Sequence, residues 1–126
     1  MLFRSVAAAT VLVLGLAGCN NEAAKEKARV EAATELKALL ADTATAYLKD
    51  SPETATALAV SEDIAGGRYQ NRLSDASAAG IAAQAVEFKA LAARYDGVRR
   101  AALTGQDAIS YDVAATALAN AVFLFY

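Results

Sequence analysis

The chain has 126 residues, of which 56% are hydrophobic, 21% are charged and one is proline. This composition excludes a disordered chain and predicts one small globular or membrane-associated unit. The chain has no histidine, no tryptophan and a single cysteine. Most enzymes use these missing side chains for proton transfer, thiol chemistry and transition-metal binding, so we expect no catalytic residue, metal site or cofactor site.

The charges nearly balance, with 12 Lys and Arg against 14 Asp and Glu and a net charge of −2. No basic stripe is available to neutralise phosphates, so nucleic acid is not an expected partner. Alanine occupies 34 positions, and only seven residues are glycine. Because alanine has the highest helix propensity, the composition predicts an all-α fold, a small helical bundle.

The first residues have the features of a bacterial export signal. Arg4 precedes the apolar stretch 6–17, which is shorter than the roughly 20 residues that span a membrane. The stretch ends in Leu16-Ala17-Gly18-Cys19, which looks like a lipobox, the cleavage motif of bacterial lipoproteins. This predicts a signal peptide over 1–18 and lipidation of Cys19. The alternatives are an uncleaved anchor and an ordinary secretory signal with an incidental cysteine.

Lipidation would place the mature chain on a membrane through its acyl chains, such as palmitate, whatever its fold. The only thiol would then be consumed, so no disulfide could form. The predicted location is the cell envelope. In a Gram-negative cell, Asn20 in place of aspartate indicates the periplasmic side of the outer membrane.

The mature chain divides into a lipidated tether, 19–29, and a helical domain, 30–126. The tether carries charges of alternating sign and no large apolar residue, which is typical of a solvated lead or a frayed helix start. A first helix is predicted over about 23–49. Its expected apolar face is the set Val30, Ala33, Leu36, Leu39, Leu40 and Tyr47. Ser51 is the expected N-cap of a short helix that runs from Pro52 to about Val60.

A connecting loop that can include one helical turn is predicted over 61–73, where Gly66 and Gly67 are adjacent. A phosphate-binding loop is disfavoured there because the following Lys-Ser/Thr is missing. Ser74-Asp75 is the expected cap of a long helix over about 76–100. The apolar stripe of that helix is Ile81, Ala85, Phe88, Leu91, Tyr95 and Val98. A final helix should begin at Thr104, and its nearly continuous apolar sequence beyond Val113 is typical of a buried helix. The core is expected to be too shallow to cover both sides of that helix, so its outer side should stay exposed.

Three groups of residues could be read as sites. Glu31 and Glu35 lie four apart on a helix and could hold a metal, but such helical sites also use histidine, so a solvated face is favoured. Tyr111-Asp112 and Arg68-Tyr69 could be read as active-site pairs. Tyrosine in an apolar stripe is more typical of a core residue whose hydroxyl reaches the rim.

From about Thr43 onward the chain resembles the N-terminal part of the bacterial domain-of-unknown-function 885 family. The segments that carry the resemblance are Ser51-Pro52-Glu53-Thr54-Ala55-Thr56-Ala57-Leu58, Arg72-Leu73-Ser74-Asp75-Ala76-Ser77, Ala101-Ala102-Leu103-Thr104-Gly105-Gln106-Asp107 and Ser110-Tyr111-Asp112-Val113. The resemblance implies a mostly helical, exported lipoprotein. It also implies a longer, zinc-metallopeptidase-like parent whose later part carries a His-Glu motif.

This chain cannot supply such a zinc site, since it has no histidine. Two hypotheses for function follow. In the first, the chain is a truncated, catalytically silent N-terminal fragment of a metallopeptidase-like lipoprotein. In the second, it is a complete small helical envelope lipoprotein with a binding or structural role. The aromatic C-terminus predicts self-association through Phe123 and Phe125.

Overall fold

The computed structural model describes the backbone of residues 14–123 and the side chains of residues 21–121. That part of the chain contains α-helices, one 3-10 turn and no strand, which confirms the all-α prediction. The α-helices are α1 (Leu14–Asp50), α2 (Pro52–Ala57), α3 (Ala78–Gly97) and α4 (Gly105–Phe123), and the 3-10 turn η1 spans Arg100–Ala102. No described helix contains an apolar stretch long enough to cross a membrane.

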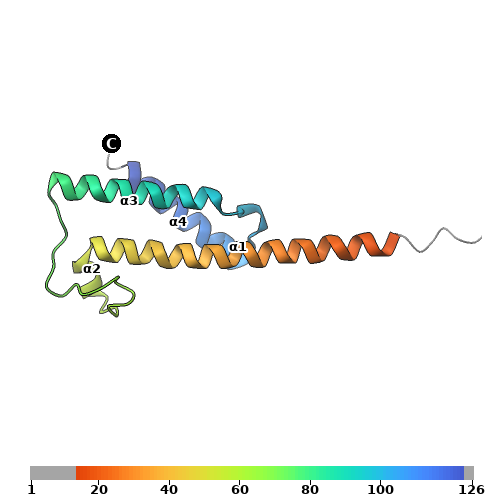
Figure 1. Cartoon of the computed structure of the whole chain (residues 1–126), viewed down its shortest axis with the longest axis horizontal. Helices are drawn as coiled ribbons and strands as arrows, with labels where there is room; N and C mark the ends of the chain where they lie inside the picture. The colour runs from red at the N-terminus through yellow and green to blue at the C-terminus, as the bar shows by residue number, and fades with distance from the viewer. Residues whose placement is uncertain (1–13, 124–126) are drawn as a thin grey trace, which may run out of the picture.

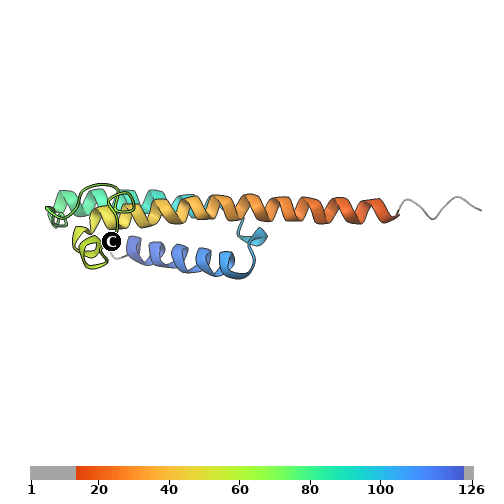
Figure 2. The ribbon, with the colours of Figure 1, turned by 90° about the horizontal axis from the view of Figure 1, so that it is seen from below.

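Helices α1, α3 and α4 lie side by side and form the body of the protein (Figures 1 and 2). Helix α3 runs antiparallel to α1, and η1 turns the chain so that α4 runs back along both. Helix α2 and the loop that follows it lie at the end of the body where α1 finishes. The other end of α1 projects beyond α3 and α4 as a single helix.

The core lies between these three helices, and none of its buried side chains is polar or charged. Its buried residues are Ala32, Leu36, Leu39 and Ala46 of α1, Phe88, Leu91, Tyr95 and Val98 packed from the α3 side, and Leu103 and Leu118 from the α4 side. Most of the α3 stripe is therefore confirmed. The prediction of burial is wrong for three residues, because the side chains of Val30, Tyr47 and Ile81 are 49%, 48% and 45% exposed.

Helix α1 begins at Leu14, earlier than the predicted start at residue 23. The stretch 19–29, expected to be a solvated tether or a frayed start, is helical throughout. Local composition accounts for this, since 22–29 consists of alanine, glutamate, lysine and arginine, which are strong helix formers.

The predicted N-cap of α2 is confirmed by position, and the predicted N-cap of α3 is wrong. Ser51 occupies the N-cap position of α2, but its side chain makes no capping hydrogen bond. Helix α3 begins at Ala78, and its N-cap is Ser77, whose hydroxyl accepts a hydrogen bond from the Gly80 amide at 3.1 Å. Ser74 instead donates its hydroxyl to Glu53 at 2.6 Å, a contact between the loop and α2. This hydrogen bond lowers the pKa of the Glu53 carboxyl.

The loop 58–77 contains no helix, as predicted for 61–73, and a small second core holds it against α1. That core consists of Leu48, Ala55, Ala65 and Tyr69. The Tyr69 hydroxyl donates to the Val60 carbonyl at 2.5 Å. Gly66 adopts a φ of 71°, and a Cβ there would lie 2.9 Å from Cγ2 of Thr45, so the loop needs glycine to approach α1 this closely.

Helix α2 ends at Ala57, before the predicted Val60, in a Schellman turn. The Val60 amide donates a hydrogen bond to the Ala55 carbonyl at 3.3 Å, and the Ala59 amide donates one to the Thr56 carbonyl at 3.1 Å. Ala59 has a φ of 49°, a left-handed conformation that costs alanine energy and that glycine adopts freely.

We therefore expect Ala59→Gly to raise the free energy of unfolding by about 0.5–1 kcal/mol, as measured by urea denaturation. The matched control is Ala57→Gly, at an exposed position inside the same helix. There glycine should lower the free energy of unfolding by about the same amount. Equal destabilisation by both variants would contradict the strain assigned to Ala59.

Helix α4 begins at Gly105, close to the predicted Thr104, and over its described side chains it is buried on one side only, so its outer side is exposed as predicted. Leu118 is its only buried residue among those whose side chains are described. Ile109 and Val113 are 56% and 64% exposed. Because α1 and α3 both lie on one side of α4, its other side has no described neighbour.

Candidate functional site

The described surface contains an apolar hollow of about 360 Å³ where α1, α3 and α4 meet. Its lining residues are Leu40, Thr43, Ala44, Tyr47, Phe88, Ala114, Ala117, Leu118 and Ala121. Thr43 and Tyr47 supply the only polar side-chain atoms of this lining. A hollow of this composition favours an apolar occupant.

A second hollow of about 300 Å³ continues the first one along α1, and the two share Leu40. It extends to Arg29 of α1 and Asp107 of α4 and also includes Lys37. We call the two hollows together the α1–α4 groove. It follows α1 from Arg29 to Tyr47, a length of about 27 Å at the helical rise per residue. Charged side chains therefore lie at one end of the groove and apolar ones at the other.

Alanines form much of the groove because they recur at helical spacing. Ala114, Ala117 and Ala121 are three and four residues apart on α4, and Ala44 lies on α1. Their small side chains leave the space between the two helices unfilled. The exposed Val113, one residue before Ala114, extends the apolar surface outward from the groove.

The hydroxyls of Thr43, Tyr95 and Tyr111 form hydrogen bonds that join the three helices. The Thr43 hydroxyl donates to the Leu39 carbonyl at 2.7 Å, so in its 3.1 Å contact with Tyr95 the Tyr95 hydroxyl is the donor. The Tyr111 hydroxyl donates to the Tyr95 carbonyl at 3.1 Å. These hydroxyls therefore fix the three helices relative to one another.

The predicted pair Tyr111-Asp112 belongs to a structural cluster. Asp112 accepts two hydrogen bonds from Arg100, at 2.7 and 2.6 Å, and these lower the pKa of its carboxyl. The Arg100 guanidinium carbon also lies 5.9 Å from the centre of the Tyr111 ring. The centres of the Tyr111 and Tyr95 rings are 5.8 Å apart. The cluster joins η1, α3 and α4.

The other predicted pairs do not converge on a site. Tyr69 is buried in the second core, whereas Arg68 is exposed. Glu31 and Glu35 are both exposed, and Glu31 lies 3.8 Å from Lys27. Among the described residues, no three or more acidic or cysteine side chains are grouped closely enough to hold a metal ion.

The predicted lipidation motif lies in the first turns of α1. The backbone of Leu16, Ala17, Gly18 and Cys19 lies within α1, but their side chains are outside the described residues. Phe123 is the last residue of α4, and its side chain is also outside the described residues, as is all of Phe125. Their predicted roles remain predictions.

No protein-family model matches the chain, and no curated protein or solved structure matches it either. The resemblance to the domain-of-unknown-function 885 family therefore remains an expectation from the quoted segments.

Sequence reasoning missed the α1–α4 groove. The available signal was the spacing of Ala114, Ala117 and Ala121 on a helix that carries large apolar residues on other faces. In a chain with 34 alanines this spacing is not distinctive, since similar intervals occur in α1 and α3 as well.

Proposed function

We propose that the chain is an exported bacterial lipoprotein that holds a helical interaction unit at the envelope membrane, without catalytic chemistry of its own. We further propose that this unit corresponds to the N-terminal part of a larger, metallopeptidase-like protein of the kind found in the domain-of-unknown-function 885 family. The Leu16-Ala17-Gly18-Cys19 junction supports the anchor.

The observation that carries the interaction role is the α1–α4 groove. It is apolar over the stretch from Leu40 to Tyr47 apart from the hydroxyls of Thr43 and Tyr47, and the Thr43 hydroxyl is held by internal hydrogen bonds. A lining without histidine or a cluster of metal-binding side chains suits docking better than bond cleavage.

In this chain the proposed occupant is a second copy. Lipid anchors would confine the copies to one membrane, which raises their effective concentration. The exposed Val113, one helical turn before the groove residue Ala117, would add apolar area to the contact. In a longer parent protein, later helices would cover the same surface.

The anchor is tested by metabolic labelling with a radioactive fatty acid in a bacterial host. We expect the label on the wild-type chain and its complete loss from Cys19→Ala, which should accumulate as a precursor or as a differently cleaved form. Ser5→Ala, a change in the signal that leaves the junction intact, is the control and should be labelled normally. Labelling of Cys19→Ala at the wild-type level would contradict the proposal.

The alternative is a complete small helical envelope lipoprotein with a binding or structural role. It is favoured by the core, which closes without further helices, since Leu36 and Tyr95 are each 1% exposed and no described polar side chain is buried there. The coding sequence beyond Tyr126 separates the two proposals. A continuation that encodes a His-Glu motif supports the fragment, and an isolated reading frame supports the complete protein.

A further inference from the structure

The N-terminal part of α1 stands apart from the rest of the protein (Figures 1 and 2). Every residue from Asn21 to Lys27 is exposed, and Ala28 and Arg29 are the first that are half-buried. Packing against α3 and α4 therefore cannot hold residues 21–27 in a helix.

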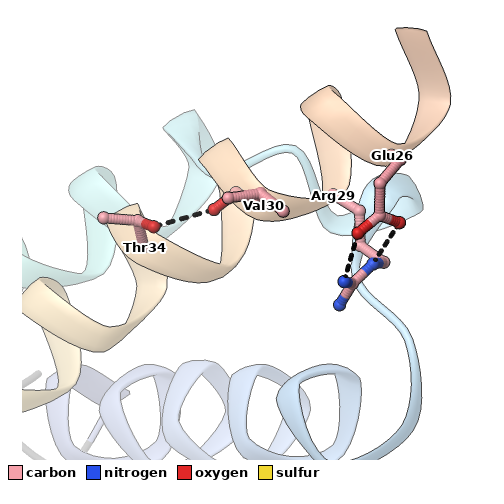
Figure 3. A network of polar contacts seen from close by, with 4 residues as sticks. All are labelled: Glu26, Arg29, Val30 and Thr34. Carbon is pink, nitrogen blue, oxygen red and sulfur yellow. Dashed lines mark hydrogen bonds and ion pairs between the residues drawn. The ribbon is translucent and has the colours of Figure 1, made fainter. Parts of the chain in front are cut away.

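Ion pairs between side chains of the same helix stabilise residues 21–27 in the helical conformation instead. Lys25 lies 2.8 Å from Glu22, and Arg29 makes two hydrogen bonds to Glu26, at 2.6 and 2.9 Å. These partners are three residues apart, a spacing at which opposite charges stabilise an isolated helix. Figure 3 shows the Glu26–Arg29 pair on the side of α1 that faces the connection between η1 and α4.

Arg29 also connects this section to the bundle. Glu26 raises the pKa of its guanidinium most strongly, and Asp107 in the first turn of α4 contributes in the same direction. Arg29 and Asp107 both line the charged end of the α1–α4 groove. The same arginine therefore interacts with the projecting section on one side and with the bundle on the other.

We infer that residues 21–27 form a stiff helical spacer that holds the bundle at a fixed distance from the anchored residue. This inference rests on the proposed lipidation of Cys19. Ala28 lies nine positions after Cys19, so the spacer sets a distance of about 14 Å between the lipid-bearing residue and the bundle. A flexible tether would let the groove approach the membrane in any orientation, whereas a helix continuous with α1 restricts both its height and its direction.

The test measures a distance along α1 in the full chain, extracted from membranes in detergent. Spin labels are placed on Ala23→Cys and Ala41→Cys, two exposed positions on the same side of the helix. A stiff spacer predicts a narrow distance distribution centred near 27 Å, with about 1.5 Å per residue. A broad distribution for this protein would overturn the inference.

Two glycine variants identify the cause. Lys25→Gly with Glu26→Gly should broaden the distribution at least about twofold, since it removes two ion pairs and adds flexible residues. The matched control, Lys37→Gly with Ala38→Gly, changes two exposed residues where α1 packs on the bundle, and it should leave the width nearly unchanged. Distance distributions of equal width for the two variants would overturn the inference of a stiff spacer.

The labelling step separates this inference from the proposed function. If Cys19 is lipidated, only the two introduced thiols react. A third reactive thiol shows that the lipidation proposal has failed, and the distance is then measured in a Cys19→Ala background. A narrow distribution in that background supports the stiff helix, and a broad one overturns it, whichever way the lipidation test falls.

Discussion

Replacing Tyr95 with alanine is expected to lower the free energy of unfolding by about 3–5 kcal/mol. Tyr95 is the largest side chain that is almost fully buried, at 1% exposure, and it lies between α1 and α4. Its ring packs on Tyr111, and its hydroxyl donates to Thr43. Small domains have a total stability of about 5–15 kcal/mol, so this loss would leave much of the protein unfolded near physiological temperature. Urea denaturation followed by circular dichroism measures it.

Two control variants separate the contribution of the Tyr95 hydroxyl from that of its buried ring. Tyr95→Phe keeps the ring and removes the hydrogen bond to Thr43, so it should cost about 0.5–1.5 kcal/mol. Tyr47→Ala removes a tyrosine ring that is 48% exposed, and it should cost clearly less than Tyr95→Ala because half of that ring already contacts water. Equal losses for Tyr47→Ala and Tyr95→Ala would contradict the central position of Tyr95.

The burial of Tyr95 was predictable from the sequence, and the exposure of Ile81 was not. Phe88, Leu91 and Tyr95 recur at helical spacing among polar residues, so the inward face of α3 follows from periodicity alone. Periodicity extends that face to Ile81 as well. It does not reveal how far along α3 the neighbouring helices reach, and Ile81 lies in the first turns of α3, where it is 45% exposed.

The cap of α3 shows a second limit of local reasoning. Ser74, Asp75 and Ser77 have similar capping chemistry and lie within four residues of one another. Ser74 bonds to Glu53, which lies 21 residues earlier, and Ser77 is left to cap the helix. The residue that caps α3 therefore depends on a tertiary contact with α2, which the local sequence does not reveal.

Neither the early start of α1 nor the α1–α4 groove could be predicted from the sequence, and the physical reasons differ. The charges between Glu22 and Arg29 alternate in sign in a way that suits both a solvated tether and a helix with internal ion pairs. The groove depends on which surfaces α4 leaves uncovered. The shallow core predicts that one side of α4 stays uncovered, but the nearly continuous apolar sequence of that helix does not reveal which side.

The uncovered side of α4 leads to the last prediction. We expect the chain without its signal and Cys19 to be helical by circular dichroism and to self-associate at tens of micromolar in analytical ultracentrifugation. Val113→Glu places a charge beside the groove at a side chain that is 64% exposed in the monomer. It should therefore leave the fold intact and weaken association by about tenfold or more, since burying an unpaired carboxylate between two copies is costly.

The matched control is Val86→Glu, the same substitution at a residue of α3 that is 71% exposed and does not line the groove. It alters the net charge by the same amount, so any effect of charge repulsion alone should appear in both variants. Polar substitutions at Phe123 and Phe125 should also weaken association if the C-terminal aromatic residues take part in the contact. Equal weakening by Val86→Glu and Val113→Glu would exclude the groove as the contact surface. A monodisperse, cooperatively melting monomer without any substitution would contradict self-association and favour the complete small lipoprotein, because its apolar groove would then be stable in water without a second copy.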